Sequence, residues 1–170
     1  MAFLDRRRGL IDAVVFSGGE PTAQTGLPEA MREARIMGYR VGLHSAGIYP
    51  RRFAEVLPFA DWVGFDAKAP FDAAYERITR VRGSGEAALA SARALLASGV
   101  ECEFRTTWDR RFLSYDELDR LTQTLADLGV RRYALQQFRD GGAGSRVADW
   151  GSVNLDELAP RFAQFCVRRA

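Results

Sequence analysis

The sequence predicts an α/β fold built on a parallel sheet. Short apolar runs rich in β-branched residues alternate five times with amphipathic stretches, and such alternation produces parallel strands joined by crossover helices. The predicted strands are mostly apolar on both faces, as expected for a sheet covered on both sides. The pattern leaves open whether the sheet is doubly wound or forms a partial (β/α) barrel. No Pro-rich or Ser-rich linker interrupts the chain, so we expect a single domain over residues 1–170.

Each element follows from a local signal. The predicted strands, about five in all, are residues 12–17, 40–45, 62–66, 100–107 and 132–138. The predicted helices are residues 24–37, 51–57, 71–79, 85–98 and a stretch that begins after Ser114 and ends at Gly129. Ser114 and Glu117 form the pattern of a capping box. Residues 139–153 read as a Gly-rich loop, and Asn154 is expected to cap a final helix that runs to the C-terminus.

The first residues resemble the end of a helix. Residues 2–8 are followed by Gly9, a residue type typical of the position just after a helix. A crossover helix follows a strand, so we expect at least one βα unit to be missing upstream. The alternative is an N-terminal helix that packs on the sheet.

Composition excludes several classes of function. The net charge of +2 gives no basic field for nucleic acid. No apolar run approaches the ~20 residues of a membrane-spanning helix, and the start lacks the apolar segment of a signal peptide, so a cytoplasmic location is expected. Cys102, Cys166 and the single histidine cannot build a zinc or iron–sulfur site alone, so no metal ligand is assigned.

Polar residues follow every predicted strand. In parallel α/β sheets ligands bind at the carboxyl ends of the strands, so these residues are the candidates for a site. They are Ser17-Gly18-Gly19-Glu20-Pro21, His44-Ser45-Ala46-Gly47, Asp66-Ala67-Lys68, Arg105-Thr106-Thr107 and Gln136-Gln137-Phe138-Arg139.

The first strand end is the most informative. Gly18 and Gly19 let the backbone approach a ligand, and Glu20 adds a carboxylate that suits a cationic group such as an ammonium. The alternative is a plain Gly-Gly turn with a solvated carboxylate.

Asp66 and Lys68 share one face because they are two positions apart on a strand end. They suit a zwitterion or a pair of ribose hydroxyls, and the alternative is a simple ion pair. Lys68 is the single lysine among 24 basic residues, which favours a functional role. Arg105 places a fixed cation on the next strand, unless it pairs with Glu101 or Glu103.

Taken together, these segments resemble the radical S-adenosylmethionine (SAM) superfamily. The similarity is greatest to its glycyl-radical-enzyme activases, above all the activating proteins of anaerobic ribonucleoside-triphosphate reductases. The segments are VVFSGGEPTAQ (14–24), GYRVGLHSAGIYPRRFAEVLP (38–58), DWVGFDAKAPF (61–71) and YALQQFRDG (133–141).

The resemblance implies a partial (β/α)6 barrel whose first βα unit is missing here. It implies that Gly18, Gly19 and Glu20 bind the methionyl amino group of SAM, that Ser45 supplies a hydroxyl, and that Asp66 and Lys68 lie near methionine and ribose. Arg105 and Gln136 are carried over as further cofactor-binding residues. The resemblance also implies that one electron from a donor cleaves SAM on a [4Fe–4S] cluster to a 5′-deoxyadenosyl radical. That radical would abstract a hydrogen from a glycine of a partner enzyme of the anaerobic ribonucleotide reductase type.

One departure from the family bears on activity. The family holds its cluster with a C-x3-C-x2-C loop that this sequence lacks, so no catalytic residue and no cluster ligand is assigned. The first hypothesis is an activase whose cluster-binding segment lies outside this chain. The second is a non-catalytic relative that binds SAM or docks on a partner. The third, by fold analogy, is an unrelated α/β protein that binds an anion near Gly83–Gly85.

Overall fold

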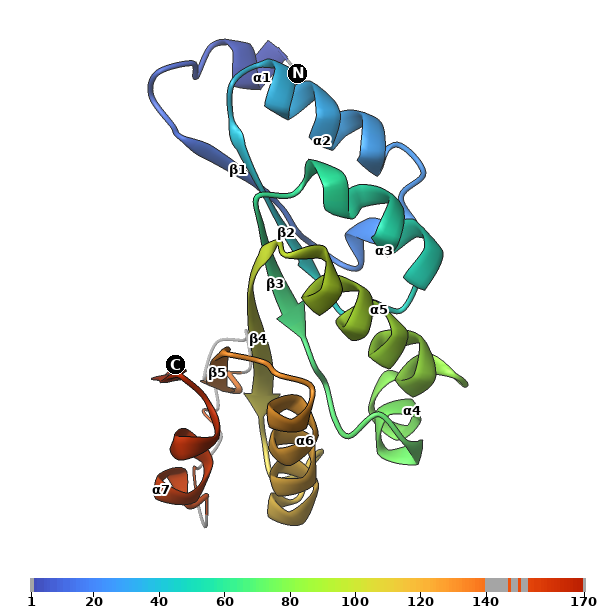
Figure 1. The fold of residues 1–170 in the computed structure, drawn as a ribbon, viewed down its shortest axis with the longest axis vertical. Coiled ribbons are helices and arrows are strands. Elements are labelled where there is room, and N and C mark those ends of the chain that lie inside the picture. The colour runs from blue at the N-terminus through green and yellow to red at the C-terminus, as the bar shows by residue number, and fades with distance from the viewer. Residues whose placement is uncertain (1, 140–146, 148–149, 151–152, 170) are drawn as a thin grey trace. The chain divides into compact units, whose positions relative to one another are not determined.

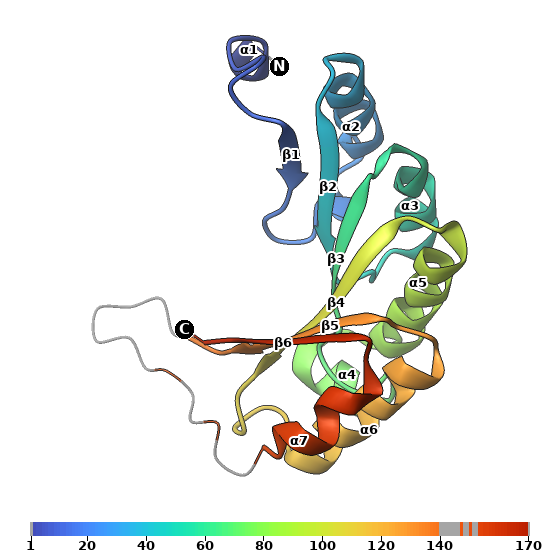
Figure 2. The ribbon, with the colours of Figure 1, turned by 60° about the vertical axis from the view of Figure 1, so that its left-hand side comes forward.

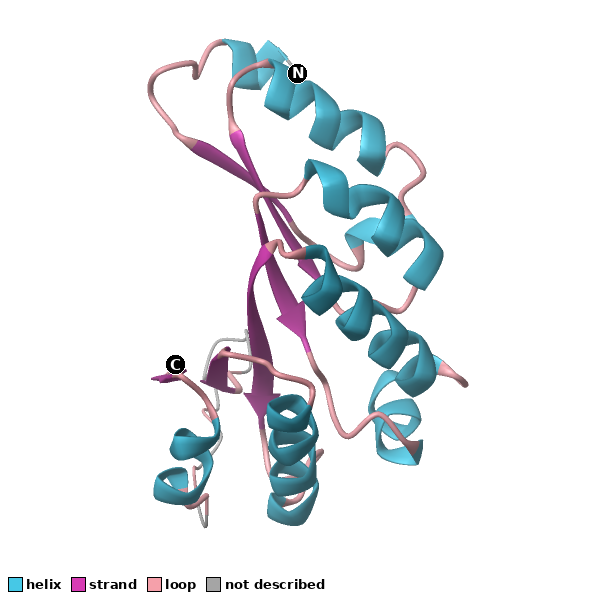
Figure 3. Cartoon of the chain, viewed as in Figure 1, coloured by secondary structure: helices cyan, strands magenta, loops and turns pink. Residues whose placement is uncertain are grey.

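The computed structural model describes residues 2–139, 147, 150 and 153–169 of the chain. The strands are β1 (Ala13–Phe16), β2 (Arg40–Ser45), β3 (Trp62–Asp66), β4 (Glu101–Trp108), β5 (Arg132–Gln137) and β6 (Gln164–Arg168). The helices are α1 (Ala2–Asp5), α2 (Leu27–Ile36), α3 (Pro50–Val56), α4 (Ala73–Thr79), α5 (Ser84–Ser98), α6 (Tyr115–Asp127) and α7 (Leu155–Leu158). Short 3₁₀ helices span Pro21–Ala23, Leu57–Phe59 and Ala159–Arg161. Figures 1 and 3 show these elements along the chain.

The described strands form one six-stranded sheet in the order β1-β2-β3-β4-β5-β6. The pairings β1–β2, β2–β3, β4–β5 and β5–β6 are all parallel. Each strand therefore pairs with its neighbour in sequence, which is the topology of a partial barrel and not of a doubly wound sheet. The predicted α/β partial barrel is confirmed, with six strands where about five were expected.

Contacts divide the chain into two compact units. The first comprises Met1–Phe65 and Ala87–Cys102, and the second comprises Asp66–Glu86 and Glu103–Ala170. The single domain expected over residues 1–170 stays a prediction.

The first unit buries one face of its strands under helices. Figure 2 shows α2, α3 and α5 on the same side of β1, β2 and β3. Met31 of α2, Phe53 of α3, Leu95 of α5 and Leu43 and Phe65 of the strands are fully buried. The rings of Phe53 and Phe65 meet edge to face at 5.9 Å, so α3 is fixed on the strand beside it.

Leucine side chains and stacked aromatic rings both contribute to the core of the second unit. Helix α6 begins with the predicted capping box of Ser114 and Glu117 and buries Leu118, Leu121 and Leu125. Tyr133 of β5 stacks on Phe162 at 4.7 Å between ring centroids. Among the described residues, no helix is both long and apolar enough to cross a bilayer.

The C-terminal prediction is wrong. A helix was expected from Asn154 to the end, but α7 covers only Leu155–Leu158. Pro160 follows within the next 3₁₀ turn, and a proline without N–H cannot continue an α-helix. Residues Gln164–Arg168 then alternate between exposed and half-buried and pair with β5, so Cys166 lies on a strand and not on a helix. Most of the predicted loop at residues 139–153 lies outside the described residues.

Two predictions at the N-terminal side also need correction. The helix expected over residues 2–8 spans only Ala2–Asp5, although Gly9 has the predicted left-handed backbone, with φ of 75°. The strand predicted at residues 12–17 is not buried, because β1 stands at the end of the sheet order and Val15 is 49% exposed. The helix predicted at residues 24–37 is shorter, because α2 spans only Leu27–Ile36 and Gly26 is its N-cap.

The exposed edge at β1 predicts self-association of the chain, because unpaired strand edges pair with other strands. Val15→Lys places a charge on this edge and should shift the protein toward monomer in sedimentation velocity. Val81→Lys is the matched control, since Val81 is 48% exposed but lies outside the strands. A wild-type chain that stays monodisperse and monomeric at high concentration would contradict this prediction.

Candidate functional site

The turn after β1 owes its shape to two glycines. Gly18 and Gly19 have φ of 94° and 54°, in the left-handed region that side chains with a Cβ rarely adopt. A Cβ at either position would meet no atom within 4 Å, so the space around the turn is open. The turn leads into the 3₁₀ helix Pro21–Ala23, and Glu20 stands at its N-cap position.

The Glu20 carboxylate joins this turn to the end of β2. Its Oε1 accepts hydrogen bonds from Thr22 Oγ1 at 2.6 Å, Thr22 N at 3.2 Å and Ser45 Oγ at 2.7 Å. Its Oε2 accepts one from Ala46 N at 2.8 Å. Glu20 is thus not the solvated carboxylate of the plain-turn alternative, and its charge is held in a fixed orientation between two strand ends.

Ser45 is 2% exposed, and its hydroxyl works in both directions. It donates to Glu20 and accepts from Gly47 N at 2.9 Å. The Gly47 carbonyl in turn accepts from Ser91 Oγ of α5 at 2.6 Å, and Ser91 is fully buried. The Ser45 hydroxyl therefore donates to the Glu20 carboxylate, and its role in cofactor binding stays a prediction.

A second polar group lies in the other unit and contains Asp66, Lys68 and Arg105. Arg105 donates from Nε at 3.0 Å and from Nη2 at 2.8 Å to Asp66 Oδ1. Lys68 Nζ lies 3.7 Å from Asp66 Oδ2. Glu103 itself pairs with Arg168. Two cations beside one carboxylate leave the group net positive.

Backbone pairing explains why these three side chains meet. Ala67 N donates to the Arg105 carbonyl at 2.9 Å, and Thr106 Oγ1 donates to the Ala67 carbonyl at 2.8 Å. These bonds hold the Asp66–Lys68 segment alongside β4. Arg105 itself is only 7% exposed, so its guanidinium stays beside Asp66, whereas Lys68 is more exposed.

Gln136 and His44 are the remaining strand-end candidates. Gln136 of β5 is in register with Thr107, and Arg105 is in register with Ala134. Gln136 and Arg105 therefore share one face of the sheet, two positions apart along it. The lone histidine, His44, contacts Ser17 Oγ at 3.3 Å and the edge of Trp62.

The anion site considered near Gly83–Gly85 already has a carboxylate beside it. Gly83 N donates to Glu76 Oε1 at 2.7 Å, and Ser84 Oγ donates to the Val81 carbonyl. Ser84 is the first residue of α5, as expected of a helix start. Nothing in this contact pattern favours an external anion.

Sequence reasoning missed two contributors to the Glu20 site, namely Thr22 and Ser91. Thr22 directly follows the Gly-Gly-Glu-Pro run, and a hydroxyl two residues after a carboxylate is a familiar turn signal. Ser91 had only a weak signal, since a buried polar residue on an Ala-rich helix can also bond to its own backbone.

Comparison with known proteins agrees with this fold. The family model "Radical SAM superfamily" matches residues 2–108, well over half of the sequence. The chain belongs to the radical SAM superfamily. That membership implies SAM and a [4Fe–4S] cluster as the cofactors of the family.

Two curated relatives are similar in sequence. A "Putative glycyl-radical enzyme activating enzyme" of Methanocaldococcus jannaschii is 30% identical over 134 residues, which is 75% of this chain and 55% of that protein. A "PqqA peptide cyclase" of Streptomyces rochei is 29% identical over 157 residues, 91% of this chain and 40% of that protein. The chain thus spans about half the length of the curated relatives it matches.

Two solved structures are similar in fold. A domain of a pyruvate-formate lyase-activating enzyme from Bacteroides vulgatus has a TM-score of 0.72 at 14% identity, covering 92% of this chain and 99% of that one. Streptococcus suis SuiB bound to SAM has a TM-score of 0.72 at 12% identity, covering 98% of this chain and 40% of that one. At these identities the likeness concerns the fold alone.

The residues of this chain do not fit the family's cluster. Three cysteines hold it in the family, and this sequence has two. Cys102 lies on β4 in the first unit, and Cys166 lies on β6 in the second. Within the described ranges no group of three His, Cys, Asp or Glu residues is arranged to hold a metal ion. No reaction step through the cluster follows from these residues.

We therefore predict that anaerobic reconstitution of the 170-residue chain with iron and sulfide yields no stable [4Fe–4S] cluster, because two thiols cannot supply three ligands. Iron and sulfide content and the absorption spectrum after gel filtration measure the outcome. The double variant Cys102→Ser, Cys166→Ser is the control for adventitious iron. If the wild-type chain binds stoichiometric iron and the double variant does not, the prediction is contradicted.

A second prediction concerns the turn beneath Glu20. A Cβ at Gly47, whose φ is 68°, would lie 2.6 Å from the Phe65 ring and 2.7 Å from Ser91 Cβ. Gly47→Ala should lower the free energy of unfolding by about 3 kcal/mol, from backbone strain and overpacking together.

Gly99→Ala is the matched control for Gly47→Ala. Gly99 has φ of 74° but open space around its Cβ position, so strain alone should cost about 1 kcal/mol. Urea unfolding measures both. Equal losses of unfolding free energy in the two variants would show that the close contacts around Gly47 do not affect stability.

Proposed function

We propose that this chain is the SAM-binding part of a radical SAM enzyme that activates a glycyl radical enzyme of the anaerobic ribonucleotide reductase type. The observation that carries the proposal is the Glu20 carboxylate, fixed at the end of β1 by donors from Thr22, Ser45 and Ala46. A family match over residues 2–108 and the similarity to a glycyl-radical enzyme activating enzyme support it. Activity, partner and electron donor belong to the whole protein and are part of the proposal.

In this proposal Glu20 binds the ammonium of SAM through charge-assisted hydrogen bonding, as a carboxylate beside open backbone suits a cation. Gly18 and Gly19 allow the ligand to approach the turn, since no side chain occupies the space beside them. Ser45 acts through Glu20, to which its hydroxyl donates.

The second polar group is net positive. Arg105 holds Asp66, and Lys68 adds a compact ammonium at its other oxygen. We propose that Asp66 and Lys68 bind a carboxylate or ribose hydroxyls of SAM, with Gln136 on the face shared with Arg105.

A second candidate function is modification of a peptide. The peptide cyclase relative is similar over 91% of this chain, and the fold neighbour SuiB has also been solved with its precursor peptide SuiA. Both candidates act on a polypeptide and need SAM. They differ in product, because activation leaves a glycyl radical on a partner enzyme and peptide modification leaves a new covalent bond in a small peptide.

The two candidates are separated with the complete protein under anaerobic, reducing conditions. An activase produces the electron paramagnetic resonance doublet of a glycyl radical when an anaerobic ribonucleotide reductase is added. A peptide-modifying enzyme produces no such signal and changes the mass of a peptide substrate. A non-catalytic SAM-binding or docking module, the second hypothesis from the sequence, produces neither.

The binding site is tested on the 170-residue chain. We predict saturable SAM binding with Kd on the order of 1 mM, weak because no iron anchors the ligand. Glu20→Gln should raise Kd about tenfold by removing a charge-assisted contact. Lys68→Arg should also raise Kd, since a planar guanidinium does not replace a compact ammonium. Ligand-observed NMR titration measures both effects.

Glu55→Gln controls for the loss of one negative charge, because Glu55 is exposed on α3. It should leave Kd unchanged. An unchanged Kd in both Glu20→Gln and Lys68→Arg, or no saturable binding by the wild-type chain, would remove the proposed site.

A further inference from the structure

The two oxygens of Glu20 have different surroundings. Oε1 accepts three hydrogen bonds, two from Thr22 and one from Ser45. Oε2 accepts one, from Ala46 N. A carboxylate oxygen accepts about two hydrogen bonds comfortably, so Oε1 is saturated within the described residues and Oε2 retains acceptor capacity. A ligand cation at this carboxylate therefore meets Oε2.

Thr22 determines which oxygen is saturated. It is 1% exposed, and both its hydroxyl and its backbone N–H donate to the same oxygen. The hydroxyl bond is the shortest of the four at Glu20. Because β-branched side chains have few χ1 rotamers, a buried threonine holds this hydroxyl in one direction.

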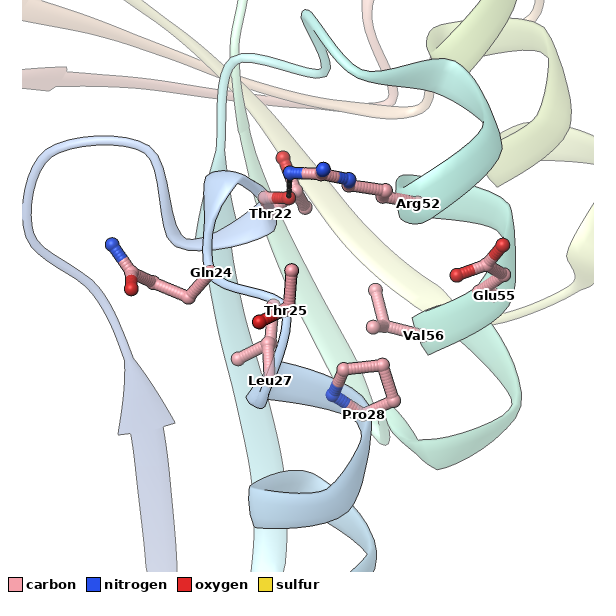
Figure 4. A pocket seen from close by; sticks show the side chains of 8 residues that line it. All are labelled: Thr22, Gln24, Thr25, Leu27, Pro28, Arg52, Glu55 and Val56. Carbon is pink, nitrogen blue, oxygen red and sulfur yellow. Dashed lines mark hydrogen bonds between the residues drawn. The ribbon is translucent and has the colours of Figure 1, made fainter.

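The 3₁₀ turn that carries Thr22 is itself fixed from α3. Figure 4 shows the Arg52 side chain extending across to the turn, where its Nη1 donates to the Ala23 carbonyl at 2.8 Å and lies 3.5 Å from the Thr22 carbonyl. The guanidinium also lies over the Tyr49 ring at 5.5 Å. Thr22 and Arg52 form part of the wall of a pocket of about 160 Å³ between the turn and α3.

We propose that Thr22 is a positioning residue, which orients Glu20 so that Oε2 alone receives the ammonium group of the ligand. The inference rests on the proposed function, in which Glu20 binds the amino group of SAM. Its physical basis is preorganisation, since a side chain that is already fixed loses no conformational freedom when the ligand binds. Thr22 thereby affects recognition of the amino acid part of the ligand and not of its nucleoside.

The test compares two ligands. S-adenosylmethionine carries the ammonium group, and 5′-methylthioadenosine has the same nucleoside without the amino acid. Thr22→Val keeps the shape of the side chain and removes the hydroxyl, whereas Thr22→Ser keeps the hydroxyl. We expect Thr22→Val to raise the Kd for SAM about fivefold to tenfold and to leave the Kd for methylthioadenosine unchanged. Thr22→Ser should stay within about twofold of the wild type for both ligands.

The outcomes separate this inference from the proposed function. If Thr22→Val leaves the affinities for SAM and methylthioadenosine unchanged, or lowers both equally, Thr22 supports only the fold. The inference is then overturned. If Thr22→Ser weakens SAM binding as much as Thr22→Val, the hydroxyl is not responsible and the inference is again overturned. Glu20→Gln in the same titration tests the proposed site itself, so a loss in Glu20→Gln without a loss in Thr22→Val rejects the inference alone.

Folding of the variants is checked by thermal unfolding. Should Thr22→Val not fold, Thr22→Ala replaces it, because a smaller side chain cannot clash with the buried surroundings. The expected result for Thr22→Ala is the same selective loss of SAM affinity, and equal affinity for SAM in Thr22→Ala and wild type would overturn the inference.

Discussion

The hydrogen bonds between Glu20 and the end of β2 determine the shape of the first strand end. A turn containing two glycines has little intrinsic preference for one conformation, because glycine is free to adopt both signs of φ. Here the carboxylate bonds to Ser45 Oγ and Ala46 N on the neighbouring strand end, which limits that freedom. Ser91 adds a buried bond to the Gly47 carbonyl, so that α5, β2 and the turn form one connected arrangement. The orientation of the Glu20 carboxylate thus depends on the packing of a helix far away in sequence.

In the second unit, ion pairing fixes the orientation of a carboxylate. Asp66 is held by the guanidinium of a nearly buried arginine, whose planar donors match a carboxylate oxygen. Lys68 is the more exposed of the two cations. The arginine thus fixes the carboxylate, and the only lysine of the sequence carries the more exposed cation.

Much of this was accessible from sequence because both the strands and their ends have local signals. Two apolar runs, one before Gly18 and one before Asp66, indicate strands, so that the residues after them are predicted at carboxyl ends of parallel strands. The structure adds the register of β4 and β5, which places Gln136 on the face of Arg105. The C-terminus failed for a physical reason. Asn154 and the acidic residues after it favour a helix, but Pro160 ends it, and Gln164–Arg168 is stabilised as a strand only by pairing with β5.

Contacts between distant residues were beyond sequence reasoning. No local sequence signal indicates that Ser91 bonds to Gly47, or that the Thr22 hydroxyl donates to Oε1 of Glu20 and not to Oε2. Such choices arise only when tertiary packing brings the groups together. The cofactor contact itself is most directly tested by a crystal structure of the chain soaked with SAM. We expect the ligand's ammonium nitrogen within about 3 Å of Glu20 Oε2. SAM bound with its ammonium group away from Glu20 would contradict it.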